Sequence, residues 1–324
     1  MKRLFHLSTI PRQLGWFEED WEQISQFVRK NNIDGIELGL TTSYTLDRIP
    51  KELIEGVHLS FYPMWLDFWQ GDLEKVISIL GSREALLDYY GGDNKEVMIA
   101  SYKKQYERAK ALGAKYMVFH VSHVLIEDSF TFTYDYSDAE VLEAAAELIN
   151  SVFEEEEGPL LLFENLWWPG LNYLNPQLTA SFLEKIHYKN KGYLLDISHL
   201  ILTNPKIGTE EEAYRYIKKV VEALGATKKD IKAIHLNKTL PKHYMSRDHS
   251  YILKKYQEAK WGYDKDKILK SHIKQMDGHQ PFIHPIAQKI VELINPDFCI
   301  YETSPQDRYE LAYFIKKQNE ALGF

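Results

Sequence analysis

The stretch Leu160-Leu161-Leu162-Phe163-Glu164-Asn165 consists of four apolar residues followed by a carboxylate and an amide. A short, uninterrupted apolar run is typical of a parallel strand that is covered on both faces. Seven further short apolar or β-branched runs occur along the chain, and we expect each of them to form a strand. They are Leu4–Ser8, Gly35–Leu38, Gly56–Leu59, Tyr116–Val121, Tyr193–Asp196, Ile231–Leu236 and Phe298–Glu302.

Longer segments between these runs place apolar residues three and four apart, which is the helical period. They are Trp21–Arg29, Val97–Leu112, Ala139–Phe153, Pro176–His187, Glu210–Leu224, Pro285–Ile294 and Arg308–Leu322. Eight strand–helix units predict an α/β protein with a (β/α)8 TIM barrel, in a single domain over residues 1–324. Extra length at Ser60–Asn94 and Asn237–Gln280 predicts inserted helical segments after the third and seventh strands.

The composition of the chain narrows the classes of protein. The 324 residues carry 39 basic and 47 acidic side chains, a net charge of −8, which disfavours a surface built for nucleic acid. The single cysteine, Cys299, excludes a disulfide framework and a cysteine-ligated zinc site. No apolar stretch approaches the ~20 residues that span a bilayer, and none near the N-terminus resembles a signal peptide. We therefore expect a cytoplasmic protein without a membrane partner; the oligomeric state stays open.

Polar side chains stand at the ends of the predicted strands, where a barrel of this kind has its active-site mouth. No arginine or lysine at a strand end balances the carboxylates among them. Oxygen and nitrogen ligands without thiolate suit Zn, Mn, Co or Fe(II), so this concentration predicts a site for divalent cations. The nine candidate ligands are His58, His120, Glu164, Asp196, His199, His235, Asp277, His279 and Glu302.

Five short motifs in this order resemble the xylose-isomerase-like TIM barrel superfamily, which contains sugar isomerases, epimerases and endonuclease IV (AP endonuclease family 2). They are Gly35-Ile36-Glu37-Leu38, Phe163-Glu164-Asn165, Asp196-Ile197-Ser198-His199, His235-Leu236-Asn237 and Tyr301-Glu302. The resemblance covers nearly the whole chain. It implies a metal-dependent enzyme.

The resemblance implies one of two ligand sets. The isomerases and epimerases would use Glu164, Asp196, His235 and Glu302 for one metal, with His199 beside the substrate. Endonuclease IV would add His58, His120 and an Asp-x-His pair, making nine ligands for three zinc ions. The chain departs from that pattern in two places: Lys238 follows Asn237, and Asp248-His249 competes with Asp277 and His279 for the displaced pair.

Two charged segments bear on the substrate. Residues 127–157 contain eleven acidic side chains and no basic ones, which would repel a DNA duplex if they faced the mouth. Lys238–Lys274 contains ten basic and four acidic residues and could hold a phosphate or carboxylate; both segments also fit solvated helix faces. Aromatic residues after strand ends suit sugar faces, unpaired bases or core packing. We expect substrate contacts from Glu37, Trp65, Trp167, Asn237 and Lys238.

Three functions fit these residues, and we place first a multinuclear metal-dependent enzyme that hydrolyses a phosphoester. Its catalytic residues would be Glu164, Glu302 and His199, with up to three ions, zinc first and Mn, Co or Mg as alternatives. The second is a mononuclear sugar or sugar-phosphate isomerase or epimerase working through an enediolate, with Glu164 and Glu302 as acid and base. The third is a barrel that binds metal or ligand without catalysis. The first two imply a small sugar or phosphoester substrate.

Overall fold

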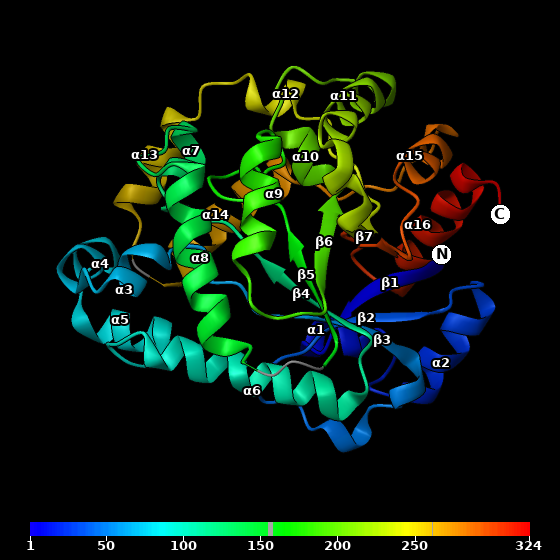
Figure 1. Cartoon of the computed structure of the whole chain (residues 1–324), viewed down its shortest axis with the longest axis horizontal. Helices are drawn as coiled ribbons and strands as arrows, with labels where there is room; N and C mark the ends of the chain where they lie inside the picture. The colour runs from blue at the N-terminus through cyan, green and yellow to red at the C-terminus, as the bar shows by residue number, and fades with distance from the viewer. Residues whose placement is uncertain (155–157, 261) are drawn as a thin grey trace.

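The computed structural model describes residues 1–154, 158–260 and 262–324. Its centre is a closed barrel in which eight parallel strands pair in chain order (Figure 1). Each predicted strand is confirmed, with ends within two residues of those expected. The strands are β1 (Lys2–Ser8), β2 (Gly35–Gly39), β3 (Ile54–His58), β4 (Tyr116–His120), β5 (Leu160–Glu164), β6 (Lys191–Asp196), β7 (Ile231–His235) and β8 (Phe298–Tyr301).

Helices surround the barrel, and the seven predicted from periodicity are confirmed as α2, α6, α8, α9, α11, α15 and α16. Short 3-10 turns lie at Leu46–Arg48, Lys51–Leu53 and Gly225–Asp230. The α-helices are α1 (Pro11–Gly15), α2 (Trp21–Lys30), α3 (Leu66–Gln70), α4 (Leu73–Leu80), α5 (Arg83–Tyr90), α6 (Glu96–Leu112), α7 (Asp128–Thr131), α8 (Asp138–Val152), α9 (Pro176–Lys185), α10 (Ile197–Leu202), α11 (Glu210–Ala223), α12 (Lys242–Met245), α13 (Ser250–Glu258), α14 (Tyr263–Met276), α15 (Ile286–Ile294) and α16 (Arg308–Leu322).

The two insertions are helical, as the sequence predicted. The segment after β3 forms α3–α5, and the segment after β7 forms α12–α14. Helix α13 packs on α7, which follows β4, so these elements lie together on one side of the molecule (Figure 1). Across the described ranges, no helix combines the length and apolar character that crossing a membrane requires.

Strand β4 illustrates why the barrel strands are apolar throughout. Tyr116 and Val118 pack in a cluster inside the barrel, whereas Met117 and Phe119 belong to the larger core between strands and helices. Successive residues of a strand point to opposite faces, and here both faces are buried. The Tyr116 ring fills the space left by Gly56 on the adjacent strand, where a Cβ would lie 2.2 Å from the ring. Its hydroxyl donates to Glu37 Oε2 at 2.9 Å.

Candidate metal centre

The centre of the site is Glu164, the last residue of β5, whose side chain is fully buried. Two histidines approach the same carboxylate oxygen: His58 Nε2 lies 3.1 Å and His120 Nε2 lies 3.2 Å from Glu164 Oε2. The other oxygen, Oε1, lies 3.1 Å from Nδ1 of His235. Parallel strands end at one mouth of the barrel, so adjacent strands β3, β4 and β5 deliver these side chains to one place.

A second group contains Glu164, Asp196, His235 and Glu302, whose ligand atoms lie within 4.8 Å of one another. Nδ1 of His235 stands between the carboxylates, 3.4 Å from Asp196 Oδ2 and 3.1 Å from Glu302 Oε2. Because Glu164 also belongs to a group with His58 and His120, it is shared by two candidate cation positions.

A third group lies beside the second and includes residues that follow α14. Asp277 Oδ2 is 3.2 Å from His199 Nε2 and 2.9 Å from His279 Nε2, and Asp196 joins His199 and His279 in a candidate cation group. His199 is positioned locally, because its backbone N–H donates to Asp196 Oδ1 at the N-terminus of α10. His279 has a φ of +41°, an unusual backbone conformation for a residue with a side chain.

The structure decides between the two Asp-His pairs. Lys238 and Gln280 exchange backbone hydrogen bonds of 2.8 and 2.9 Å, which hold the segment after α14 against the chain leaving β7. Asp277 is therefore brought to the mouth. Asp248 instead accepts hydrogen bonds from Ser250 at the exposed start of α13, and His249 packs among rings away from the cluster.

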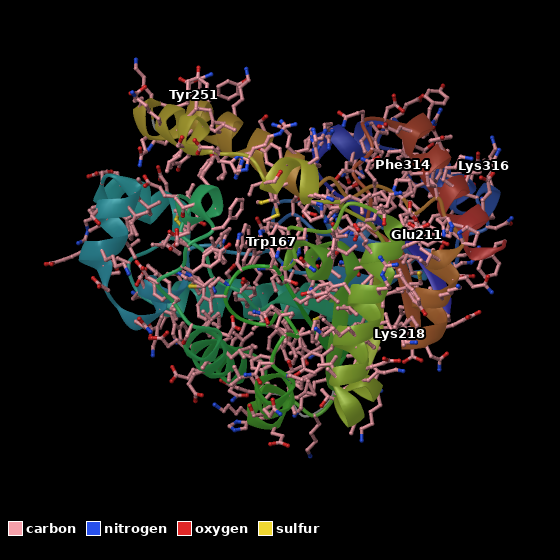
Figure 2. All side chains as sticks on the ribbon, turned by 90° about the horizontal axis from the view of Figure 1, so that it is seen from above. Trp167, Glu211, Lys218, Tyr251, Phe314 and Lys316 are labelled. Atoms are coloured by element: carbon pink, nitrogen blue, oxygen red, sulfur yellow. The ribbon has the colours of Figure 1, made fainter. Side chains whose placement is uncertain are left out.

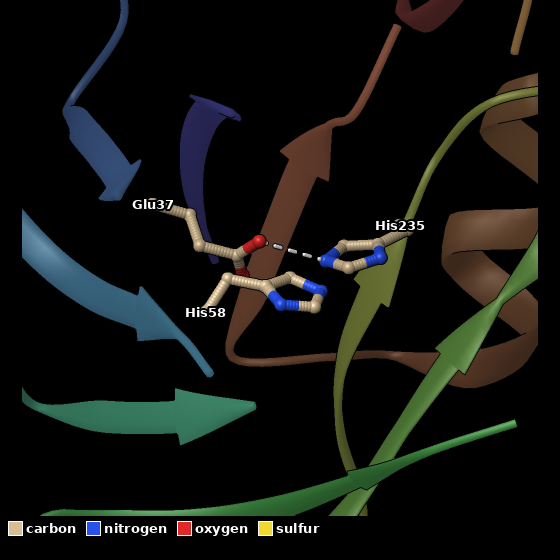
Figure 3. A group of neighbouring side chains, drawn as sticks. All are labelled: Glu37, His58 and His235. Atoms are coloured by element: carbon tan, nitrogen blue, oxygen red, sulfur yellow. Dashed lines mark hydrogen bonds and ion pairs between the residues drawn. The ribbon is translucent and has the colours of Figure 1, made fainter. Parts of the chain in front are cut away.

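Three of the histidines are oriented by a hydrogen bond from one ring nitrogen. His58 Nδ1 donates to the Leu59 carbonyl at 3.1 Å and His199 Nδ1 to the Asn165 carbonyl at 2.8 Å. His235 Nε2 lies 3.0 Å from Glu37 Oε1 (Figure 3). Donation from one ring nitrogen fixes the tautomer and leaves the other with a lone pair, as metal-ligating histidines require.

Protonated histidines lie beside the carboxylates of the site. Burial alone lowers the pKa of His58, but the hydrogen bond and attraction from Glu164 outweigh it and raise this pKa to about 9. By the same balance, neighbouring carboxylates raise the pKa of His279 to about 9 and that of His199 to about 10. Burial raises the pKa of Glu164, but the surrounding histidines hold it well below its usual value. Divalent cations could replace these protons as counterions of the carboxylates.

A cavity of about 1090 Å³ opens over the cluster. Six of the twelve buried polar side-chain atoms that have no hydrogen bond, among the residues described, belong to its lining. His279 Nε2 and Glu302 Oε2 lie near charged groups without the alignment of a hydrogen bond. The six atoms are His120 Nδ1, Trp167 Nε1, Trp168 Nε1, His279 Nε2, Glu302 Oε2 and Thr303 Oγ1. The two indole N–H groups can only donate hydrogen bonds, whereas the carboxylate oxygens and imidazole nitrogens of the cluster fit divalent cations.

Of the five residues expected to contact substrate, one lines the cavity and four lie outside its lining. Trp167, which is labelled in Figure 2, lines the cavity, and its ring centroid lies 5.2 Å from that of His199. Trp65 is buried away from the cavity lining, where its N–H donates to the Ser122 carbonyl, so we assign it a packing role. The remaining three make contacts within the protein and also lie outside the lining: Glu37 with His235, Asn237 with Asp196, and Lys238 with Glu210.

Sequence reasoning missed several residues of the cavity. His6 on β1 lines it, with Nδ1 3.2 Å from Glu37 Oε1; a histidine inside the apolar run Leu4–Ser8 was the available signal. Arg12 from α1 also lines the cavity, although no basic residue stands at a strand end. Thr303, directly after Glu302, completes the rim of β8.

The acidic segment does not lie at the mouth as a whole. Glu140, Glu143 and Glu147 are exposed on α8, an outer helix, and do not line the cavity. Glu143 forms an ion pair with Lys185 of α9. Residues 155–157, which contribute to the predicted acidic face, lie outside the described residues. The acidic residues of α8 that the structure describes are therefore not part of the cavity wall that a substrate meets.

We predict that Glu37→Gln lowers metal affinity about 10–100-fold while the fold persists. The neutral amide keeps the size of the side chain but holds the His235 ring less strongly, so Nδ1 becomes a weaker ligand. Competition with a chromogenic chelator measures the affinity, with Glu52→Gln on the exposed surface as the control. An unchanged affinity in Glu37→Gln would show that the buried carboxylate does not support the metal centre.

A family model described as xylose isomerase-like TIM barrel matches residues 26–270. The solved structure of endonuclease IV from Thermus thermophilus has a TM-score of 0.55 at 15% identity, covering 100% of this chain and 99% of that one. A 3-keto-D-glucoside 4-epimerase from E. coli gives 0.52 at 11%, with full coverage of both chains. A D-tagatose 3-epimerase-like protein gives 0.54 at 14%, covering 100% and 97%. No curated protein matches this sequence.

Proposed function

The chain belongs to the xylose isomerase-like TIM barrel family, and from that premise we propose that it is a multinuclear, divalent-metal-dependent hydrolase of phosphoesters. The observation that carries this proposal is the sharing of Glu164 by two ligand groups, next to a third group around His199 and His279. A mononuclear centre has no need of His58, His120 and Asp277 in contact with the same cluster.

In this proposal the nine predicted ligands hold up to three ions, with zinc as the first candidate. Bound cations would lower the pKa of an attacking water and polarise a phosphoryl oxygen. Asn165 and Asn237 orient Asp196: Asn165 Oδ1 accepts from the Asp196 backbone N–H at 2.8 Å, and Asn237 Nδ2 donates to Asp196 Oδ2 at 3.0 Å. The ring of Trp167 packs against His199 at one side of the cluster and is itself nearly buried.

One observation favours a second candidate, a mononuclear sugar isomerase or epimerase. Glu164, Asp196, His235 and Glu302 form the four-residue group among the candidate sites, and both glutamates contact His235. In that function Glu164 and Glu302 would exchange protons with carbons on opposite faces of the substrate. His58, His120 and Asp277 would then contact substrate or stabilise the fold.

The two functions differ in metal content, and Asp277→Asn tests them. We expect close to three ions per chain by elemental analysis of protein purified without added metal or chelator, together with phosphate release from phosphoesters. Asp277→Asn should lose about one ion and most of the phosphate release, because Asp277 links His199 and His279. Asp248→Asn, at an exposed carboxylate, is the matched control and should lose neither.

Other outcomes would contradict the proposal. One ion per chain with unchanged content in Asp277→Asn, combined with turnover of sugars only, would replace the hydrolase with the isomerase. No metal after reconstitution would exclude both enzymes, since both depend on the carboxylate–histidine cluster.

A further inference from the structure

One wall of the cavity is basic. Helix α14 lines it with three lysines and one aspartate among apolar residues: Lys265, Asp266, Leu269, Lys270, Ile273 and Lys274, whose spacing of three and four residues places them on one helical face. At about 1.5 Å of rise per residue, Lys274 and Lys270 stand roughly 5 and 10 Å along the helix from Asp277. The distance from these two lysines to the metal centre is therefore one that a small molecule can span.

Lys274 is the cation of this wall that is most available to a ligand. Lys270 forms an ion pair with Asp266, with Nζ and Oδ2 3.1 Å apart, and Lys265 lies over the ring of Tyr256. Lys274 is exposed and has no ion pair with any residue of the described ranges. Another part of the lining, from α5, is acidic and contributes Glu84 and Asp88. An anionic group in the cavity is thus attracted towards α14 and repelled from α5.

The base of the basic wall holds two hydrogen-bond donors that the protein does not use. Trp167 and Trp168 are only 8% and 6% exposed, and the N–H of each indole is buried without an acceptor. Both rings pack in one cluster with Met276 and Ile273 of α14. Leaving a buried donor unpaired costs about 1–3 kcal/mol, so an acceptor oxygen at this place would be favourable.

We propose that α14 and the Trp167–Trp168 pair form a second anion subsite, which takes a phosphate or carboxylate remote from the phosphoester bound at the metal centre. The inference rests on the proposed function and narrows its substrate class to small organic phosphates with two separate anionic groups (doubly anionic, counting groups and not charges). Lysine supplies the charge, and the two indole N–H groups supply directed donors. The substrate's uncharged part would lie along Leu269, Ile273 and Phe61.

The test compares paired probes on the metal-loaded protein by calorimetry. The affinity for fructose 1,6-bisphosphate, compared with that for fructose 6-phosphate, gives the contribution of a second phosphate to binding. The affinity for 6-phosphogluconate, compared with that for glucitol 6-phosphate, gives the contribution of a carboxylate. We expect at least one doubly anionic probe to bind more tightly than its partner. Whichever pair shows the larger difference identifies the anion.

Variants then locate the subsite. Lys274→Gln should weaken the doubly anionic probe about tenfold, the range of a charge-assisted hydrogen bond, and leave its singly anionic partner unchanged. In turnover, KM should rise while kcat stays constant, because the residue lies away from the reacting group. Lys267→Gln, on a part of α14 that does not line this cavity, is the matched control. Trp168→Phe replaces the indole with a smaller aromatic ring, removes the N–H and should also weaken binding.

Equal affinity within both probe pairs, or no binding of any probe, would overturn the subsite. So would an equal loss for both members of a pair in Lys274→Gln. Tighter binding of a doubly anionic probe that depends on Lys274, without phosphate release from any probe or phosphoester, would keep the subsite and reject the hydrolase.

Discussion

Glu164→Gln should abolish metal binding at the two candidate positions that share this residue and reduce phosphoester hydrolysis by at least about 10³-fold. The substitution retains the shape of the side chain but removes the charge that three histidines face within 3.2 Å. Removing one partner of a buried ion pair costs about 3–5 kcal/mol, equal to roughly 10²–10³-fold or more in an equilibrium. Loss of two ions makes the effect on turnover larger still.

The measurements for this variant are elemental analysis and phosphate release, with circular dichroism to verify the fold. Glu184→Gln, at an exposed position of α9, is the matched control and should keep full metal content and activity. If Glu164→Gln retained its ions and lost less than tenfold in kcat/KM, Glu164 would not be the shared ligand, and the multinuclear proposal would lose its main support.

Removal of metal by a chelator should abolish activity and lower the melting temperature, and zinc should restore both. A ligand present at 1,000 times its Kd stabilises the folded state by about 4 kcal/mol per site. Fluorimetric melting before and after chelation, followed by re-addition of Zn, Mn, Co or Mg, measures this and ranks the ions. A melting temperature that is independent of metal, in a protein that stays active, would contradict the proposed centre.

The metal-free protein should also lose stability as the pH rises. His58, His279 and His199 have pKa values raised to about 9, 9 and 10, above the usual value near 6.5 of an unfolded chain. Groups with a raised pKa stabilise the folded state fully below the unfolded value, and this contribution disappears as the pH passes the folded value. Melting temperatures should therefore fall between about pH 6.5 and pH 10 without metal, and fall less with zinc bound. A rise over this interval in the metal-free protein would contradict the assigned charge pairing.

Solved proteins with this barrel have different activities, so the fold alone does not decide this chain's chemistry. The structural neighbours include an endonuclease IV and a 3-keto-D-glucoside 4-epimerase, at 15% and 11% identity. The proposal of hydrolysis rests on the set of side chains around Glu164. The proposed substrate class rests on the insertion α12–α14, whose last helix lines the cavity. Reaction and substrate class are thus proposed from separate parts of the chain.

The barrel and the strand-end residues of the cluster could be predicted from the chain's local patterns. Apolar runs such as Leu160–Phe163 are local, their length and spacing define parallel strands, and a residue ending such a run faces the mouth whatever its neighbours are. Glu164, Asp196 and His235 could therefore be identified from their positions in the chain alone.

The remaining features could not be predicted in this way, because they depend on contacts between distant segments of the folded chain. Asp277 was preferred over Asp248 by backbone hydrogen bonds between Lys238 and Gln280, which no local pattern encodes. Glu37 lies beside His235, 198 positions away, because the barrel closes and not because of its own motif. The basic wall likewise exists because α14 folds back over the mouth, whereas in the sequence its lysines resemble any solvated helix face.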